Sequence, residues 1–183
     1  MRILTLAGSP RFPSRSTALL THCQRKLEAR GADVVAWNIH NFPPEELIHA
    51  RFDSPALKAF SADVASATGI IVSTPVYKAS FSGALKTVLD LLPERALEEK
   101  VVLPLASGGS VAHMLALDYG LKPVLSALKA QEVLQGVFAQ DLQITHYDRQ
   151  PEFAGDLTSR IDDALESFWL ALQRRHLPFA RAV

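Results

Sequence analysis

The chain has 183 residues, of which 48% are hydrophobic and 21% charged, and its 19 Lys and Arg balance 19 Asp and Glu. This composition is typical of a globular protein, and the zero net charge disfavours nucleic acids and anionic membrane surfaces as partners. A single cysteine, Cys23, excludes an internal disulfide, and no apolar run has the length of a membrane span, so we expect a cytoplasmic protein. We expect one domain over residues 1–175 and a C-terminal tail over residues 176–183.

Short apolar runs alternate with longer amphipathic stretches along the chain. Strands are expected at residues 2–7, 33–38, 69–73, 100–106 and, less regularly, within 132–144; helices are expected at 17–30, 55–67, 82–92, 111–130 and 157–175. Such alternation is typical of parallel βαβ units with helices on both faces of the sheet. The sequence therefore predicts an α/β, flavodoxin-like fold with a five-stranded parallel sheet in the order 2-1-3-4-5. Ligands of such a fold bind outside the carboxyl ends of strands one, three and four.

The loop at residues 8–17 joins the first strand to the first helix. Its hydroxyl and guanidinium side chains are candidates for binding a phosphate: Ser9, Arg11, Ser14, Arg15, Ser16 and Thr17. Unpaired N–H groups at a helix N-terminus attract anions, and hydroxyls with arginine suit a terminal phosphomonoester. The loop has neither the Gly-Lys-Ser/Thr of a Walker A motif nor the three-glycine dinucleotide fingerprint, which disfavours those sites. The alternative is a plain turn in which Ser16 or Thr17 only caps the helix.

Two further loops follow the third and fourth expected strands, at the same edge of the sheet. The first contains Pro75, Val76, Tyr77 and Lys78, and the second contains Ser107, Gly108 and Gly109. Proline fixes the local backbone and glycine allows backbone to approach closely, as the edge of a planar heteroaromatic ring requires. The alternatives are a packing role for Tyr77, a solvated charge for Lys78 and an ordinary turn at the glycines. Three unusual loops around one crevice favour a ligand site.

The expected fourth helix, at residues 111–130, is apolar on more than one face. This pattern indicates burial beyond a single contact with the sheet, as at a subunit interface. Asp118, Tyr119 and Gly120, with Pro123 close behind, mark a place where regular α-helical geometry is expected to be disturbed, either by a π-bulge or by a proline kink.

No hydrolytic or metal-binding constellation stands out in the sequence. Ser9 and Ser16 have no evident His and Asp partners, and the six histidines are scattered without the spacing of metal ligands. An enzyme without a nucleophile or general base is one whose cofactor carries the chemistry.

Several stretches resemble the NADPH-dependent FMN reductases, and most closely the flavin reductases of two-component alkanesulfonate monooxygenase systems. They are LAGSPR at 6–11, SRS at 14–16, TPVYK at 74–78, SGALK at 82–86 and LASGG at 105–109, with further similarity at 41–42, 50–58, 91–97 and 121–132. The similarity covers nearly the whole chain and fades after about residue 172.

The resemblance implies a specific ligand arrangement and assembly. FMN would place its phosphate in the loop from Ser9 to Thr17 and its ring against Pro75–Lys78 and Gly108–Gly109, with NADPH delivering hydride to flavin N5. It also implies a homo-tetramer, a dimer of dimers, built through the fourth helix. Tyr119 matches a tyrosine that forms a π-helix in the sulfonate-system reductases, which implies that FMN is a substrate that leaves after reduction. The reduced FMN would supply a partner alkanesulfonate monooxygenase for sulfur acquisition.

Two other functions stay open at this point. One is an FMN-bound NAD(P)H quinone or azo reductase. The other is a flavodoxin-type electron carrier, which the neutral composition disfavours because such carriers tend to be strongly acidic. The sequence pattern locates no residue that would distinguish NADPH from NADH.

Overall fold

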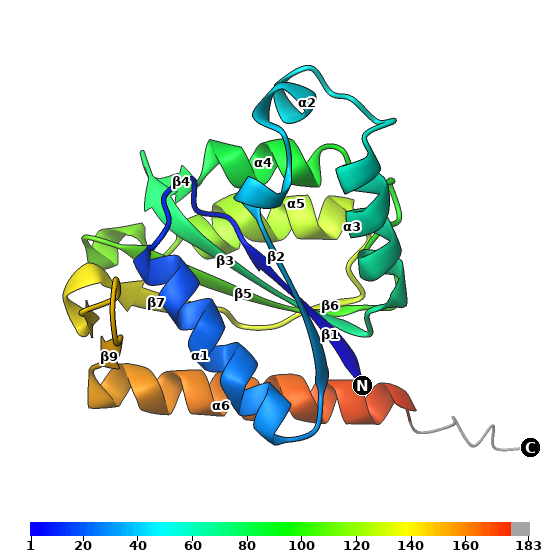
Figure 1. Ribbon diagram of the computed structural model, residues 1–183. Helices are drawn as coiled ribbons and strands as arrows, with labels where there is room; N and C mark the ends of the chain where they lie inside the picture. The colour runs from blue at the N-terminus through cyan, green and yellow to red at the C-terminus, as the bar shows by residue number, and fades with distance from the viewer. Residues whose placement is uncertain (177–183) are drawn as a thin grey trace, which may run out of the picture.

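The computed structural model describes residues 1–176 (Figure 1). Of the expected C-terminal tail, His176 belongs to the last helix, and residues 177–183 lie outside the described residues.

A parallel sheet forms the centre of the molecule. Its strands are β1 (Arg2–Ala7), β2 (Asp33–Asn38), β3 (Gly69–Tyr77), β5 (Val101–Gly108), β6 (Glu132–Val133) and β7 (Val137–Gln140). They run in the order β2-β1-β3-β5, with β6 and β7 both paired to β5, and this confirms the predicted order. The short β4 (Ser80–Phe81) folds back antiparallel on β3, so the sheet has seven strands in all. A separate hairpin consists of β8 (Ile144–Thr145) and β9 (Glu152–Phe153).

The expected fifth strand is interrupted by a bulge opposite Pro104. β6 aligns Glu132 with Val101, whereas β7 aligns Val137 with Leu105, so the residues at 134–136 lie opposite only those at 103–104. Pro104 has no N–H to donate, and its carbonyl faces the bulge so closely that a Cβ on Gly136 would lie 2.5 Å from it. The single strand expected within 132–144 is therefore corrected to two pieces that differ in register by one residue.

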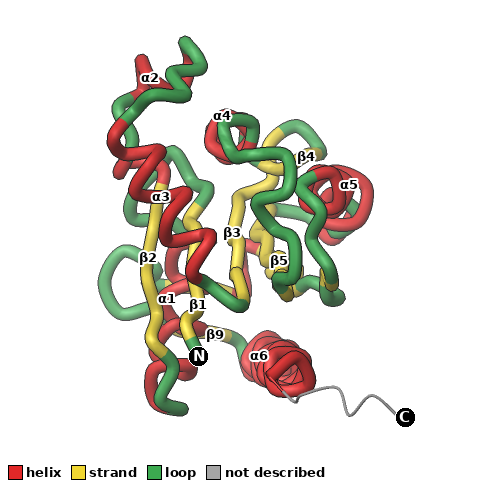
Figure 2. Tube along the Cα trace, turned by 90° about the vertical axis from the view of Figure 1, so that its right-hand side faces the viewer, coloured by secondary structure: helices red, strands yellow, loops and turns green. Residues whose placement is uncertain are grey.

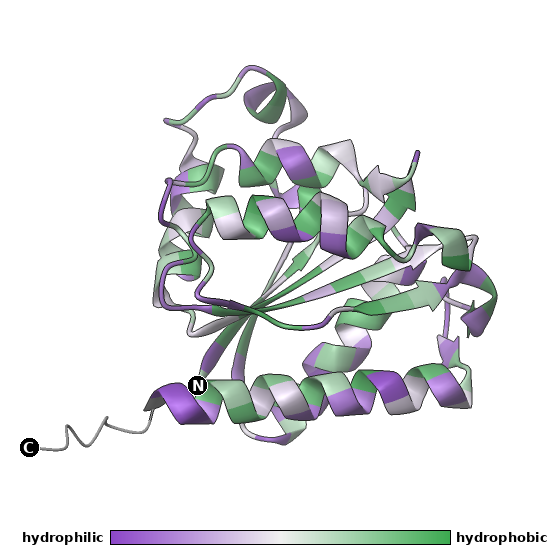
Figure 3. Ribbon diagram, turned by 180° about the vertical axis from the view of Figure 1, so that it is seen from behind, coloured by the Kyte–Doolittle hydropathy of each residue, from purple (hydrophilic) through white to green (hydrophobic). Residues whose placement is uncertain are grey.

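Helices cover both faces of the sheet, as predicted (Figures 1 and 2). On one face lie α1 (Arg15–Ala29) and α6 (Gly155–His176); on the other lie α3 (Pro55–Ser66), α4 (Gly83–Leu89) and α5 (Lys122–Ala127). The short α2 (Pro44–Ile48) lies between β2 and α3. Alternate strand residues pack into the two layers, for example Ile71 toward α1 and α6, and Ile70 toward the opposite helices. Figure 3 shows that the central strands are largely hydrophobic, whereas α6 has hydrophilic residues along its outer side.

The segment expected as one long helix at residues 111–130 is broken into three parts. A short 3-10 turn, η2 (Val111–His113), precedes a π-helix, η3 (Leu117–Leu121), and α5 follows it. The disturbance lies at Asp118-Tyr119-Gly120, where the sequence predicts it, and it is a π-helix rather than a proline kink. Lys122 N–H donates to the carbonyl of Leu117, and Pro123, the next residue, has no N–H with which to continue that series of bonds.

Among the helices within residues 1–176, none is both long enough and apolar enough to cross a membrane.

Candidate active site

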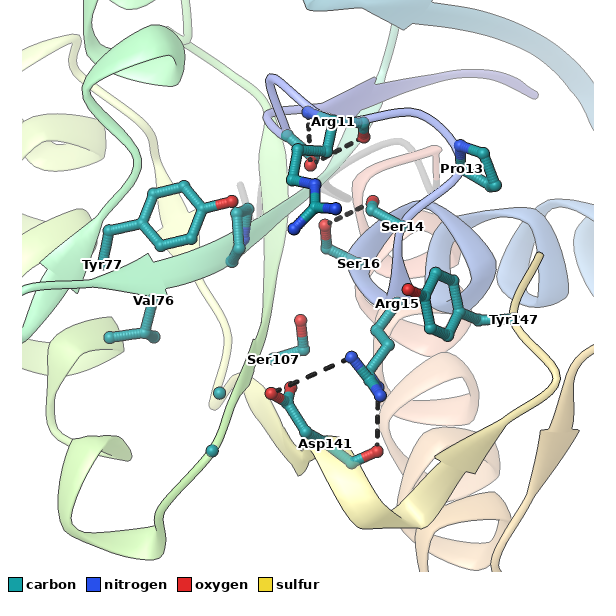
Figure 4. A pocket seen from close by; sticks show the side chains of 14 residues that line it. Arg11, Pro13, Ser14, Arg15, Ser16, Val76, Tyr77, Ser107, Asp141 and Tyr147 are labelled. Atoms are coloured by element: carbon teal, nitrogen blue, oxygen red, sulfur yellow. Dashed lines mark hydrogen bonds and ion pairs between the residues drawn. The ribbon is translucent and has the colours of Figure 1, made fainter.

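A pocket opens at the carboxyl ends of β1, β3 and β5 (Figure 4). The sequence-predicted residues that line it are Ser9, Arg11, Ser14, Arg15, Ser16, Pro75, Val76, Tyr77, Ser107, Gly108 and Gly109. Pro13, Asp141 and Tyr147 line it as well and were missed by the sequence prediction. Thr17 and Lys78 do not line it. The three loops singled out in the sequence therefore converge on one site.

The loop after β1 presents a cluster of hydroxyl groups at the start of α1. Ser14, rather than Ser16 or Thr17, caps the helix: its Oγ accepts the N–H of Thr17 at 3.1 Å and lies 3.1 Å from Ser16 Oγ and 2.7 Å from Thr17 Oγ1. Within residues 1–176, the N–H groups of Arg15 and Ser16 at this end have no acceptor. Free N–H groups and hydroxyls at a helix N-terminus form a site for an anion.

The two arginines of the loop play different roles in the structure. Arg15 Nε donates to the carbonyls of Asp141 at 2.9 Å and Ile144 at 3.3 Å, and its guanidinium carbon lies 4.5 Å from the centre of the Tyr147 ring. The Arg11 guanidinium has no hydrogen-bond or ion-pair partner within residues 1–176, and Figure 4 shows it between Tyr77 and Ser16. Arg11 is therefore the available cation of the pocket, and Arg15 joins the loop to the segment after β7.

The loop and the end of β3 are fastened together by buried hydroxyl groups. Ser73 Oγ donates to the carbonyl of Ser16 at 2.8 Å, and Ser82 Oγ donates to the carbonyl of Gly8. Thr74 Oγ1 accepts the N–H of Ser82 at 3.0 Å. Each of these buried hydroxyls has a hydrogen-bond partner, and together the bonds hold the floor of the pocket against the start of α1.

Lys78 lies at the corner of a tight hairpin rather than on the pocket wall. Tyr77 pairs with Ser80, so Lys78 and Ala79 are the two turn residues, with φ of 49° and 63°. Positive φ at both central residues matches the twist of a two-residue hairpin. Neither residue is Gly or Asn, which explains why β4 could not be predicted from the sequence pattern.

The two glycines after β5 leave room on the wall of the pocket. A Cβ on Gly108 would lie 3.3 Å from the Phe138 ring and 3.4 Å from Val76, whereas a Cβ on Gly109 would meet nothing closer than 3.9 Å. Gly108 therefore serves the packing of the wall, and Gly109 leaves open space beside it.

Asp141 and Tyr147 reach the pocket from the segment that follows β7, the last parallel strand. Both residues follow β7, and the irregular apolar pattern of residues 132–144 did not show where this strand ends. A signal was present: Asp141 follows the last parallel strand, and the carboxyl ends of parallel strands meet at one edge.

The π-helix η3 places an aromatic side chain on the surface. Tyr119 is 80% exposed, and Val111, Met114 and Leu115 are also exposed on the same segment. Lys122 Nζ lies 2.5 Å from Asp118 Oδ1 across the π-turn. The segment at residues 111–121 thus combines an irregular helical backbone with exposed apolar side chains.

Comparison with known proteins agrees with this geometry. Residues 1–144 match the family model described as NADPH-dependent FMN reductase. The chain is 63% identical to an FMN reductase (NADPH) of Escherichia coli K12 over 175 residues, 96% of this chain and 92% of the relative. It is 56% identical to an FMN reductase (NADPH) of Pseudomonas putida KT2440 over 100% of this chain and 94% of the relative.

A solved structure gives the same result for the fold. The crystal structure of an NADH:FMN oxidoreductase in its apo form superposes with a TM-score of 0.83 at 35% identity, covering 98% of this chain and 96% of that one. The chain therefore belongs to the NADPH-dependent FMN reductase family, whose members are oxidoreductases that use FMN and NADPH.

Proposed function

We propose that this FMN reductase binds oxidised FMN as a substrate, reduces it with hydride from NADPH, and releases the reduced FMN to a partner alkanesulfonate monooxygenase in the cytoplasm. The observation that carries the release step is the π-helix at Leu117–Leu121, with Tyr119 exposed on it. Irregular turns of this kind are often functional.

The pocket residues fit FMN from its phosphate to its ring. The N–H groups of Arg15 and Ser16 and the Arg11 guanidinium would bind the phosphate, together with the hydroxyls of the loop. Thr17 contributes through its bond with Ser14 rather than from the pocket wall.

The backbone of Pro75–Tyr77 and of Gly108–Gly109 would border the ring. FMN, when bound, supplies the hydride-accepting N5. The chain supplies orientation. Within residues 1–176, the pocket lining contains no histidine, lysine or cysteine, and its one carboxylate, Asp141, lies 4.0 Å from the Arg15 guanidinium. Lys78, at the hairpin corner, is proposed to lie near the edge of the reduced ring.

The exposed surface of η2 and η3 is proposed as the contact that builds a homo-tetramer, a dimer of dimers. Val111, Met114, Leu115 and Tyr119 form an apolar surface that a partner subunit would cover. A subunit contact next to the pocket would couple assembly to the exchange of flavin, since a Cβ added to Gly120 of the π-helix would lie 3.2 Å from Ser80 Oγ on the β3–β4 hairpin.

NADPH is proposed as the coenzyme because the family model is named for NADPH, whereas the solved relative is named for NADH. Oxidation of each coenzyme with and without added FMN tests the proposal directly, on protein whose visible spectrum is recorded first. Colourless protein whose NADPH oxidation requires added FMN supports it. Strongly yellow protein that turns over faster with a quinone than with FMN would favour an FMN-bound quinone or azo reductase. Sulfite release by an added alkanesulfonate monooxygenase tests the partner, and light scattering tests the tetramer.

A further inference from the structure

The pocket at the carboxyl ends of β1, β3 and β5 has a single carboxylate in its lining. Within residues 1–176 this carboxylate belongs to Asp141, and the two cationic side chains of the lining are Arg11 and Arg15. The arginines suit a phosphorylated ligand, because guanidiniums form charge-assisted hydrogen bonds with phosphate oxygens. A carboxylate repels the same phosphate, so phosphate binding does not account for Asp141 in this wall.

Asp141 lies on the wall against which the flavin ring is proposed to rest. The pairing of β5 with β7 aligns Gly108 with Gln140, the residue before Asp141. This register places Asp141 beside Gly109, and a Cβ on Gly109 would lie 3.9 Å from Asp141 Oδ2. The carboxylate is therefore next to the proposed ring site.

Asp141 also limits how much of the Arg15 charge acts on a ligand. Asp141 Oδ2 lies 4.0 Å from Arg15 Nη1 (Figure 4). The anchor of Arg15 is separate, because its Nε donates to the main-chain carbonyls of Asp141 and Ile144. Replacement of the carboxylate by an amide would thus change the charge of the wall and leave this anchor in place. Both side chains are partly exposed, so water screens their charges and the effect on a ligand is moderate.

Reduction changes the charge of FMN at its ring and leaves its phosphate unchanged. Hydride leaves C4 of the reduced nicotinamide with both electrons of the C–H bond, and it forms an N–H bond at flavin N5. The coenzyme thereby becomes more positive by one charge, and the flavin becomes more negative by one. The added charge is spread over the pyrimidine part of the ring. A fixed carboxylate beside the ring repels this anion but has no net charge to repel on the oxidised ring.

We propose that Asp141 determines the redox specificity of the pocket by weakening the binding of reduced FMN relative to oxidised FMN. This inference rests on the FMN site proposed above. It adds an electrostatic contribution to product release that is separate from the π-helix. Lys78, the cation proposed to lie near the same ring, is outside the lining and stays unchanged when Asp141 is replaced.

The experiment compares Asp141→Asn with the unchanged protein at pH 8. Oxidised FMN, and photochemically reduced FMN under anaerobic conditions, are titrated calorimetrically, and the ratio of the reduced to the oxidised dissociation constant is calculated. Removal of one partly screened charge is expected to lower this ratio by about three- to tenfold. The two-electron midpoint potential of bound FMN should rise accordingly, by about 30 mV for a tenfold change.

Two control variants separate the charge of Asp141 from other effects. Asp162→Asn removes the same charge from a partly exposed carboxylate that pairs with Lys26 outside the pocket lining, so the ratio should not change. Asp141→Glu keeps the charge and should keep the ratio of the unchanged protein. Asp141→Ala also removes the charge and takes the place of Asp141→Asn if that variant does not fold.

Each outcome decides a specific point. A lower ratio in Asp141→Asn, with no such change in Asp162→Asn or Asp141→Glu, supports the proposal. An unchanged ratio, or the same decrease in Asp162→Asn, overturns it. Equal changes in the binding of both flavins overturn it as well, because they would place the effect on the phosphate or on the fold of the wall. Failure of the unchanged protein to bind oxidised FMN would instead refute the proposed function.

Discussion

The guanidinium of Arg15 stacks 4.5 Å above the centre of the Tyr147 ring, joining the first turn of α1 to a residue near the other end of the chain. The same side chain holds the carbonyls of Asp141 and Ile144. One arginine thus connects two walls of the pocket in which FMN is proposed to bind. Its removal would affect the pocket by releasing the segment after β7 as well as by removing charge.

Arg15→Ala is expected to raise the dissociation constant for FMN by roughly 10- to 100-fold, since bonds to a charged group contribute about 1.5–3 kcal/mol. Arg15→Lys keeps the charge but loses the planar stack and the Nε donor, so it should restore binding only in part. Fluorescence titration with FMN measures both. Unchanged affinity in Arg15→Ala would show that neither its charge nor its bonds to the hairpin segment matter for the ligand.

Ser16→Ala tests the proposed phosphate site separately from the proposed ring site. Ser16 is buried beside Ser14, and its hydroxyl is proposed to bind the flavin phosphate. We expect weaker binding of FMN, by about 1.5–3 kcal/mol, and unchanged binding of riboflavin, which has no phosphate. Parallel titrations with the two flavins provide the comparison. Weakened binding of both would place the effect on the fold of the loop instead.

Gly8→Ala is expected to destabilise the protein without any loss of a ligand contact. A Cβ at Gly8 would lie 2.8 Å from the Cβ of Leu85, in the core between β1 and α4, and overpacking of this kind costs about 1–3 kcal/mol. Gly109→Ala is the matched control, because its Cβ has open space. Thermal unfolding should show a fall of roughly 2–4 °C per kcal/mol for Gly8→Ala and little change for the control. Equal melting temperatures would contradict the packing argument.

Tyr119→Ala tests the link between the π-helix and flavin exchange. If the exposed ring promotes release of flavin, turnover of free FMN should fall and FMN should remain bound through purification. The visible spectrum of the purified variant and steady-state oxidation of NADPH are the measurements. Tyr119→Phe keeps the ring and should behave like the unchanged protein. A colourless Tyr119→Ala variant with unchanged rates would remove the basis for the release step.

Cys23 is predicted to make stability depend on pH in the alkaline range. Burial raises the pKa of its thiol from 9.0 to about 12, so the folded protein keeps the proton while the unfolded chain releases it. This contribution is fully present below pH 9 and is lost as the pH rises toward 12. The loss of stability is about 1.4 kcal/mol at pH 10.

Urea unfolding at pH 8 and pH 10 measures this effect. Cys23→Ala serves as the reference, because it removes the thiol but leaves every other titrating group in place. The unchanged protein should lose more stability between the two pH values than Cys23→Ala does. Identical losses would show that the thiol ionises equally in both states.

Sequence patterns predicted the strands and the three pocket loops because both depend on local signals, and the strand order followed from the flavodoxin-like succession of βα units. The runs at residues 70–72 and 101–103 are apolar without alternation, as in strands covered on both faces, and the loops carry turn residues. The β3–β4 hairpin was missed because Lys78 and Ala79 adopt positive φ without being glycine. The contact of Arg15 with Tyr147 could not be predicted, because it depends on how two segments far apart in the sequence fold together.

The bulge opposite Pro104 inverts which face of the sheet each later residue of the last strand meets. Val133 and Val137 are four residues apart and would share a face in an uninterrupted strand, yet Val133 packs toward α3, α4 and α5, and Val137 packs toward α1 and α6. The same inversion turns Phe138 to the side where it backs Gly108 in the pocket wall. A proline in the middle of β5 thereby determines which side chain supports the surface on which the flavin ring is proposed to rest.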